Sequence, residues 1–172
     1  MRNRFLILSV VMATLFACSS DSMSTDDMNK PGGERATPVN FKIKNLEGTY
    51  TLGPGDDSCG PNFLIARGEG TVSHLGKSML MEDWCFDQTI PNDPGTKRSV
   101  IFVAANGDEL WSNDGTVQWT SPLSFVEEFE FIGGTGRFSN ASGTFTETVE
   151  ISPPDAQGAG TFTLNSEGTL TY

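Results

Sequence analysis

The sequence has few of the residues that most often carry chemistry. Its 172 residues include one histidine, His74, and three cysteines. Zinc sites need several histidine or cysteine ligands at regular spacing, and no such spacing surrounds His74. No serine or cysteine nucleophile can be assigned to His74 either, so acyl-transfer chemistry has no support. The sequence therefore identifies no catalytic residue and predicts neither a metal nor a cofactor.

Positive charge is also scarce. Lysine and arginine together number 11 against 22 aspartates and glutamates, which gives a formal net charge of -11. Such a chain repels nucleic acid phosphates and anionic lipid. Nucleic acid is therefore not an expected partner, and no basic patch would hold the chain on a membrane. An acidic surface also keeps a β-rich protein soluble, an explanation that needs no partner.

The N-terminal apolar run is short. It spans Phe5–Ala17, 13 residues, whereas a membrane-spanning helix needs about 20. Two arginines precede the run and Cys18 follows it, the order of a secretory signal peptide. Leu-Phe-Ala-Cys at 15–18 resembles the bacterial lipobox, in which the cysteine is acylated and becomes the first residue after cleavage. The resemblance implies a lipid anchor on Cys18 with the membrane as partner; an ordinary secretory signal is the alternative.

The composition divides the chain into three parts. Residues 1–17 are predicted to be a lipoprotein signal peptide, residues 18–39 the lipidated cysteine with a disordered tether, and residues 40–172 one domain. The tether is rich in Ser, Asp, Gly and Pro and cannot bury enough apolar surface to fold. Because Ser19, not an aspartate, follows the cysteine, we expect an outer-membrane location in a bacterial cell envelope, on the periplasmic or surface face.

Two cysteines remain if Cys18 carries lipid. Cys59 and Cys85 lie in the expected exported domain, where disulfides form and persist. Cysteine arithmetic therefore predicts one disulfide between them. By lowering the entropy of the unfolded chain, this bond would stabilise the fold by about 3–4 kcal/mol.

Helical periodicity is missing from Phe41 onward. No window repeats apolar residues at i, i+3, i+4 and i+7, whereas short runs rich in Thr, Val, Phe and Ile alternate with turn residues, a pattern typical of strands. The expected strands are Phe41–Lys44, Gly48–Leu52, Phe63–Leu75, Lys77–Phe86, Arg98–Ala104, Glu109–Asn113, Thr116–Thr120, Phe125–Ile132, Gly143–Ile151, Gly160–Asn165 and Glu167–Tyr172.

Turn residues and the last strand suggest how these strands connect. Asn106-Gly107 and the segment 113–115 predict hairpin turns, because Asn and Gly tolerate positive φ. The chain ends in a strand that can pair with an early one, and closure removes the exposed edges of a sheet. The fold class is therefore predicted to be all-β, a single closed antiparallel barrel of about eight strands in preference to a sandwich.

One segment carries a family resemblance. The run Phe-Ile-Gly-Gly-Thr-Gly-Arg-Phe at 131–138, followed by Ala-Ser-Gly-Thr-Phe at 141–145, resembles the glycine-rich turn of the dirigent and allene-oxide-cyclase-like barrels. With the segments at 70–78, 104–108 and 168–172, the resemblance covers most of residues 62–172. It implies a β-barrel, in which an interior cavity could take a small apolar ligand. The catalytic residues of the plant enzymes do not match this sequence position by position.

Two glutamates are singled out by their position along strands. Glu127 and Glu147 each interrupt an apolar series at spacing two, and that spacing keeps side chains on one face of a strand. We expect both to point into the barrel, where a carboxylate must be paired or protonated. Arg137 or Lys77 could be such a partner. The alternative places both glutamates near strand ends, in solvent.

Three further residues are ligand-binding candidates. Trp111 and Trp119 could line a small-molecule cavity, although core packing is the other use of such rings. His74 would share a strand face with Val72. The sequence thus predicts a binding or surface-structural module, with a small apolar ligand as a candidate partner. The alternative is a cyclase or isomerase that uses His74 and the interior carboxylates.

Overall fold

The computed structural model describes residues 36–172, except residues 57, 88, 91, 92, 94, 96 and 114 and the side chain of Lys97. The predicted signal peptide and Cys18 lie outside the described residues, as does the predicted tether up to residue 35. Within the described ranges no helix has the length and apolar character needed to cross a membrane. The elements are β1 Val39–Pro54, β2 Asn62–Val72, β3 Gly76–Phe86, β4 Lys97–Ala104, β5 Glu109–Ser112, β6 Thr116–Ser121, β7 Ser124–Gly134, the 3-10 helix η1 Gly136–Phe138, β8 Ser142–Ile151 and β9 Ala159–Thr171.

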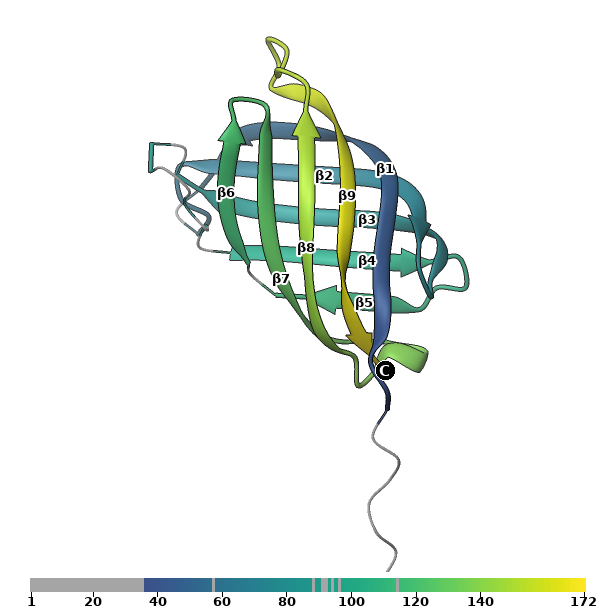
Figure 1. Cartoon of the computed structure of the whole chain (residues 1–172). Helices are drawn as coiled ribbons and strands as arrows, with labels where there is room; N and C mark the ends of the chain where they lie inside the picture. The colour runs from purple at the N-terminus through teal and green to yellow at the C-terminus, as the bar shows by residue number, and fades with distance from the viewer. Residues whose placement is uncertain are drawn as a thin grey trace, which may run out of the picture. The chain divides into compact units, whose positions relative to one another are not determined.

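The strands form one antiparallel sheet that closes on itself. The pairing order is β5-β4-β3-β2-β1-β9-β8-β7, and β5 also pairs with β7, so eight positions complete a ring. In Figure 1, β6 to β9 run across the front and β2 to β5 cross behind them, while β1 bends from one set to the other. The predicted all-β, closed antiparallel barrel of about eight strands is confirmed.

Strands β5 and β6 share one position in this ring. β5 pairs with the end of β7, where Leu110 lies opposite Gly134, and β6 pairs with its start, where Trp119 lies opposite Phe125. Both strands run in the same direction, so the predicted hairpin at 113–115 is wrong: the segment interrupts a strand and does not reverse it. A Cβ on Gly115 would lie 1.5 Å from the carbonyl oxygen of Glu128, so the chain there passes too close to β7 for a side chain.

Other local predictions fare better. The turn at Asn106-Gly107 joins β4 to β5, with Gly107 at φ 86° and its N–H donating to the Ala104 carbonyl at 2.9 Å. The two strands expected at 41–44 and 48–52 merge into β1, whose register shifts between Lys44 and Glu47. The last two expected strands likewise merge into β9. Two mergers therefore account for the difference between the expected and the observed number of strands: β1 continues across a bulge, and β9 pairs with β8 without a register shift.

The two ends of the barrel differ. We call the end with the connections 73–75, 105–108 and 135–141 the closed end, and the end with 55–61, 87–96, 122–123 and 152–158 the open end. Phenylalanine rings fill the interior near the closed end, with centroid distances of 4.5 to 5.9 Å among Phe41, Phe102, Phe129, Phe131 and Phe145. Helix η1 lies at this end beside the C-terminus (Figure 1), where the Phe138 ring is buried 5.0 Å from that of Tyr172.

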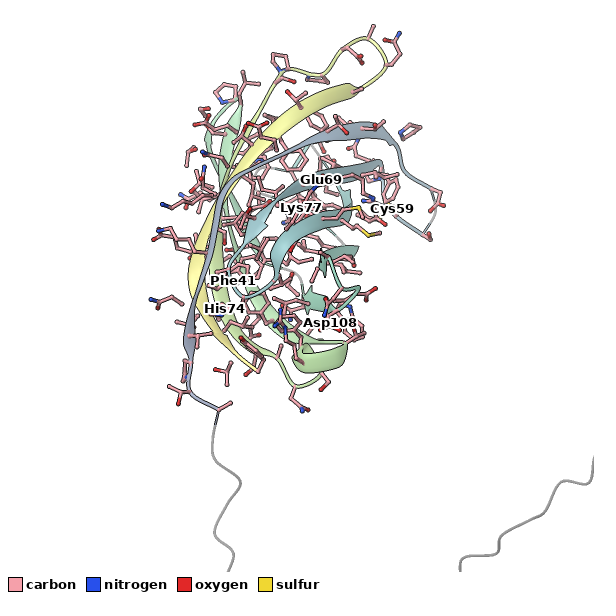
Figure 2. The ribbon with its side chains drawn as sticks, turned by 90° about the vertical axis from the view of Figure 1, so that its right-hand side faces the viewer. Phe41, Cys59, Glu69, His74, Lys77 and Asp108 are labelled. Atoms are coloured by element: carbon pink, nitrogen blue, oxygen red, sulfur yellow. A yellow bond between two sulfur atoms is a disulfide. The ribbon has the colours of Figure 1, made fainter. Side chains whose placement is uncertain are left out.

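A disulfide supports the open end. Cys59, in the β1–β2 connection, is bonded to Cys85 near the end of β3, with Cα atoms 4.9 Å apart. Figure 2 shows the yellow sulfur bond beside the labelled Cys59, well away from His74 at the other end of the barrel. The disulfide predicted from the cysteine count is confirmed.

Candidate functional site

A layer of polar side chains crosses the middle of the barrel interior. It contains Glu82 on β3, Arg98 on β4, Glu127 on β7, Glu147 on β8 and Ser166 on β9, all buried. Strand register brings them together: Glu127 lies opposite Glu147, and Glu147 opposite Ser166. Side chains along a strand point alternately to its two faces. Each of these residues lies at spacing two from apolar inward-facing neighbours, so this alternation directs it into the core.

Arg98 is the cation of this layer. Its Nε and Nη2 both donate to Oε1 of Glu82, at 2.8 and 2.6 Å, and Nη2 also donates to Oε1 of Glu127. The guanidinium carbon lies 4.5 Å from the ring centroid of Trp84 and 4.7 Å from that of Phe129. Burial disfavours its charge, but attraction to Glu82 and Glu127 raises the pKa of Arg98 overall. The guanidinium therefore stays charged inside the barrel.

The carboxyl groups outnumber this single cation. Burial raises the pKa of Glu127 to about 7 although Arg98 acts to lower it. Glu147 forms no ion pair within the described part of the chain. Burial first, and then the charges of Glu127 and Glu82, raise its pKa well above 4.5. Buried atoms without a hydrogen-bond partner in the described structure are Nη1 of Arg98, Oε2 of Glu127, Oε1 of Glu147 and Oγ of Ser166. The layer therefore holds three carboxyl groups against one guanidinium, and burial favours the protonated form of Glu147.

The two glutamates found from the sequence occupy the predicted place. Glu127 and Glu147 are each 1% exposed and face the interior, so the expectation that they point inward is confirmed. The expected partners are wrong. Arg137 is exposed on η1 and donates to the carbonyl of His74, while Lys77 pairs with an exposed glutamate on the outer face. The partner of Glu127 is Arg98.

Sequence reasoning missed Arg98 and Glu82, although the same signal was present. Glu82 lies between Leu80 and Trp84 at spacing two, and Arg98 begins a series at spacing two that continues with Val100 and Phe102. Each therefore shares a strand face with apolar residues, as the two predicted glutamates do. The same argument from alternating strand faces, applied to charges of both signs, identifies the four charged residues of the layer.

A cavity lies on the open-end side of this layer. Its volume is about 180 Å³, and Glu82 and Arg98 are the charged residues in its described lining. The walls are otherwise apolar apart from the hydroxyl of Tyr50, which donates to the Ser152 carbonyl. A cavity of roughly 150 Å³ lined by apolar side chains accepts a benzene ring, so this one has room for a ring-sized molecule. Its aromatic lining residues are Tyr50, Trp84, Phe86, Trp119, Phe125 and Phe162.

The other sequence candidates fall in different places. Trp119 lines the cavity at its rim and is 41% exposed. Trp111 points to the outside of the barrel, because its neighbours Leu110 and Ser112 take the inward positions; its Nε1 donates to Glu109 at 2.7 Å. Trp111 therefore lies outside the cavity lining.

His74 also lies away from the carboxylates. β2 ends at Val72, so the expected strand through residue 75 is too long, and His74 occupies the β2–β3 turn with φ 66°. It is exposed at the closed end, with Nε2 2.9 Å from the Asn40 carbonyl oxygen. Elsewhere in the described chain, no three His, Cys, Asp or Glu side chains are grouped so as to hold a metal ion.

The chain resembles known proteins in fold but not in sequence. No protein-family profile matches the chain, and no curated protein matches it in sequence. Two solved structures that are similar in fold are both described as pterocarpan synthase dirigent proteins. One is 12% identical with a TM-score of 0.48, covering 82% of this chain and 88% of the other; the second is 12% identical with a TM-score of 0.43, covering 81% and 96%. At this distance their activity is not transferred to the chain.

Proposed function

We propose that the barrel is a binding module for a small, largely apolar molecule, which occupies the cavity at the open end. The observation that supports this proposal is the cavity itself, about 180 Å³ in volume. Its walls are apolar, and its floor, the name we give to the part next to the polar layer, is formed by Glu82 and Arg98. Protein interiors are close-packed, and voids larger than a water molecule are few. A concave, mostly apolar site with a few convergent polar groups is the usual form of a ligand pocket.

A pair of matched substitutions tests the proposal. Ala66 lines the cavity, whereas Ala104 is buried near the closed end. Ala66→Phe should fill the cavity and abolish binding of a neutral probe, 3,3-dimethylbutan-1-ol, with little loss of stability. Ala104→Phe should instead cost about 1–3 kcal/mol through overpacking and leave binding intact in the protein that remains folded. NMR chemical-shift titration measures the binding, and the proposal fails if the wild type shows no saturable shift.

Native mass spectrometry of the purified protein provides an independent test. A co-purifying small molecule that is absent from the Ala66→Phe protein would identify a natural ligand. The same mass in both proteins would place that molecule outside the cavity.

We further propose that a lipid on Cys18 holds this module at the bacterial cell envelope, in the outer membrane. The support is the short apolar run and the lipobox-like residues at 15–18. Cys18→Ser should block processing and release the protein from the membrane fraction, whereas Ser19→Ala should leave fractionation unchanged. A Cys18→Ser protein that is cleaved and sediments with membranes like the wild type would contradict the anchor.

The enzyme alternative is not carried forward. It required His74 beside the interior carboxylates, and His74 is an exposed turn residue at the opposite end from the cavity. No observation at the site favours a cyclase or isomerase over binding.

A further inference from the structure

Aromatic rings dominate the wall of the cavity. Six lining side chains are aromatic, and they come from β1, β3, β6, β7 and β9. The face of an aromatic ring carries partial negative charge and attracts a cation within about 6 Å. The protein already uses this attraction at the cavity floor, where the guanidinium of Arg98 lies over the ring of Trp84. Alkylated ammonium groups suit such walls because their methyl groups are apolar while the group as a whole is charged.

At the floor of the cavity, the carboxylate of Glu82 is more exposed than the guanidinium of Arg98. The side chain of Glu82 is 11% exposed, whereas that of Arg98 is 1% exposed. Both hydrogen bonds from Arg98 to Glu82 end on Oε1. Oε2 of Glu82 accepts no hydrogen bond within the described part of the chain. Glu82 lines the cavity, and its carboxylate therefore keeps an oxygen with remaining capacity as an acceptor.

The polar layer next to the cavity also favours a positively charged ligand. Three glutamates, Glu82, Glu127 and Glu147, face the single cation Arg98. When Glu82 and Glu127 are both ionised, the layer carries excess negative charge, since one guanidinium faces two carboxylates. A bound cation would offset that charge, whereas a bound anion would add to it. The net charge of -11 on the whole chain attracts cations toward the protein over a longer range.

From these observations we infer that the cavity binds a small organic cation, an alkylated ammonium group on a short apolar body, with its charge between the aromatic walls and the carboxylate of Glu82. This inference rests on the proposed binding function and narrows its ligand to one charge class. A neutral apolar molecule would use the walls but not Glu82, and a carboxylate would be repelled by the floor.

Three probes of one shape test the inference on the purified full-length protein. Choline, 3,3-dimethylbutan-1-ol and 3,3-dimethylbutanoate share a head of three methyl groups and differ in charge: positive, neutral and negative. We expect choline to bind about tenfold more tightly than the alcohol, a difference of about 1.4 kcal/mol, and the carboxylate to bind most weakly. Equal affinities for choline and the alcohol would overturn the inference and leave the proposed function standing. Absence of binding by all three would overturn both.

Variants assign the effect to the cavity. Glu82→Gln should remove most of the advantage of choline and leave the affinity for the alcohol unchanged. Glu69→Gln is the matched control: it removes the same charge from an exposed residue on the outer face, paired with Lys77, and should leave the choline advantage intact. If both variants lose that advantage equally, general electrostatic attraction explains it and the site assignment is wrong.

A second variant guards against misfolding of Glu82→Gln, which loses a partner of Arg98. Trp119→Leu keeps an apolar residue at the exposed rim but removes the ring. We expect its affinity for choline to fall about fivefold, in line with the loss of one cation–π contact, with a smaller change for the alcohol. A Trp119→Leu protein in which both affinities change by the same factor would show that the walls do not recognise charge.

Discussion

The barrel interior has two halves that are both apolar and are packed differently. Near the closed end, phenylalanine rings cross the interior and contact one another, and Gly168 gives Phe145 room, since a Cβ there would lie 2.6 Å from the Phe145 Cβ. Near the open end, aromatic side chains stand around a cavity of about 180 Å³. The polar layer separates the two halves. An apolar strand face thus determines which way a side chain points, while side-chain size and glycine placement determine whether the interior is filled.

The largest expected effect contrasts the same substitution in the two halves. Phe145→Ala should lower the free energy of unfolding by about 3–5 kcal/mol, because it removes a buried ring and leaves a void. Phe125→Ala, beside the existing cavity, should cost less than half of that, since part of its surroundings is already unfilled. Guanidinium chloride unfolding of both variants measures the difference. Equal losses would show that the two halves are packed equally well.

The disulfide is expected to matter almost as much, and its effect belongs to the open half. Replacing Cys59 and Cys85 together by serine should lower the free energy of unfolding by about 3–4 kcal/mol, the entropy of closing the loop between them. Urea unfolding with and without reductant measures the effect. Reductant should destabilise the wild type and leave the double variant unchanged; a reductant effect on the double variant would contradict the assignment.

A substitution of Arg98 tests the polar layer that separates the two halves. Arg98→Met should cost about 3 kcal/mol at pH 8, because Glu82 and Glu127 would remain buried without their cation. The loss should shrink at pH 5, because the raised pKa of Glu127 lets that carboxyl group take up a proton. Thermal unfolding at the two pH values checks this, with Arg137→Met on the exposed helix η1 as a control expected within about 0.5 kcal/mol of the wild type. A loss that is independent of pH would indicate lost packing in place of lost charge pairing.

The smallest expected effect distinguishes the two central glutamates. A carboxyl group with a raised folded-state pKa contributes stability that is complete below its unfolded pKa near 4.5 and is lost as pH rises through the folded value, about 7 for Glu127. Glu147→Gln should therefore raise the free energy of unfolding at pH 8 by about 1 kcal/mol or more, since one pKa unit corresponds to about 1.4 kcal/mol, and change little at pH 4. Glu127→Gln should gain less, because it gives up the ion pair with Arg98. The free energy of unfolding of both variants, measured from pH 4 to 8, distinguishes the two glutamates. A larger gain for Glu127→Gln would contradict the assignment of the Arg98 ion pair to Glu127.

Strand parity made much of the fold and part of the site predictable from the sequence. The all-β barrel, the disulfide and the inward orientation of Glu127 and Glu147 follow from local periodicity and cysteine counting. The partner Arg98 could not be chosen that way, because pairing across the barrel depends on how strands distant in sequence are aligned. Parity identifies inward-facing charges but does not show which of them meet.

Two features depended on backbone geometry that residue types do not specify. Glycine at residue 115 suggested a turn, yet the chain continues in the same direction against β7. His74 adopts a positive φ that non-glycine residues rarely take, which ends β2 earlier than its β-prone residues suggest. The cavity was likewise not predictable, since its volume depends on how side chains from several strands pack around it.

The division of one ring position between β5 and β6 has a consequence for motion. Closure depends on the short ladder of Leu110, Trp111 and Ser112 with β7, whereas the other neighbouring strands of the ring pair over longer ladders. Residues 97–99 of β4 pair with β3 alone, because β5 ends at Ser112 and pairs no further along β4. Opening at this seam breaks few hydrogen bonds, and local unfolding needs the least free energy where backbone pairing is sparse. The amide protons of β5 and β6 should therefore exchange with solvent faster than those of β1 and β9, while the rest of the barrel remains folded.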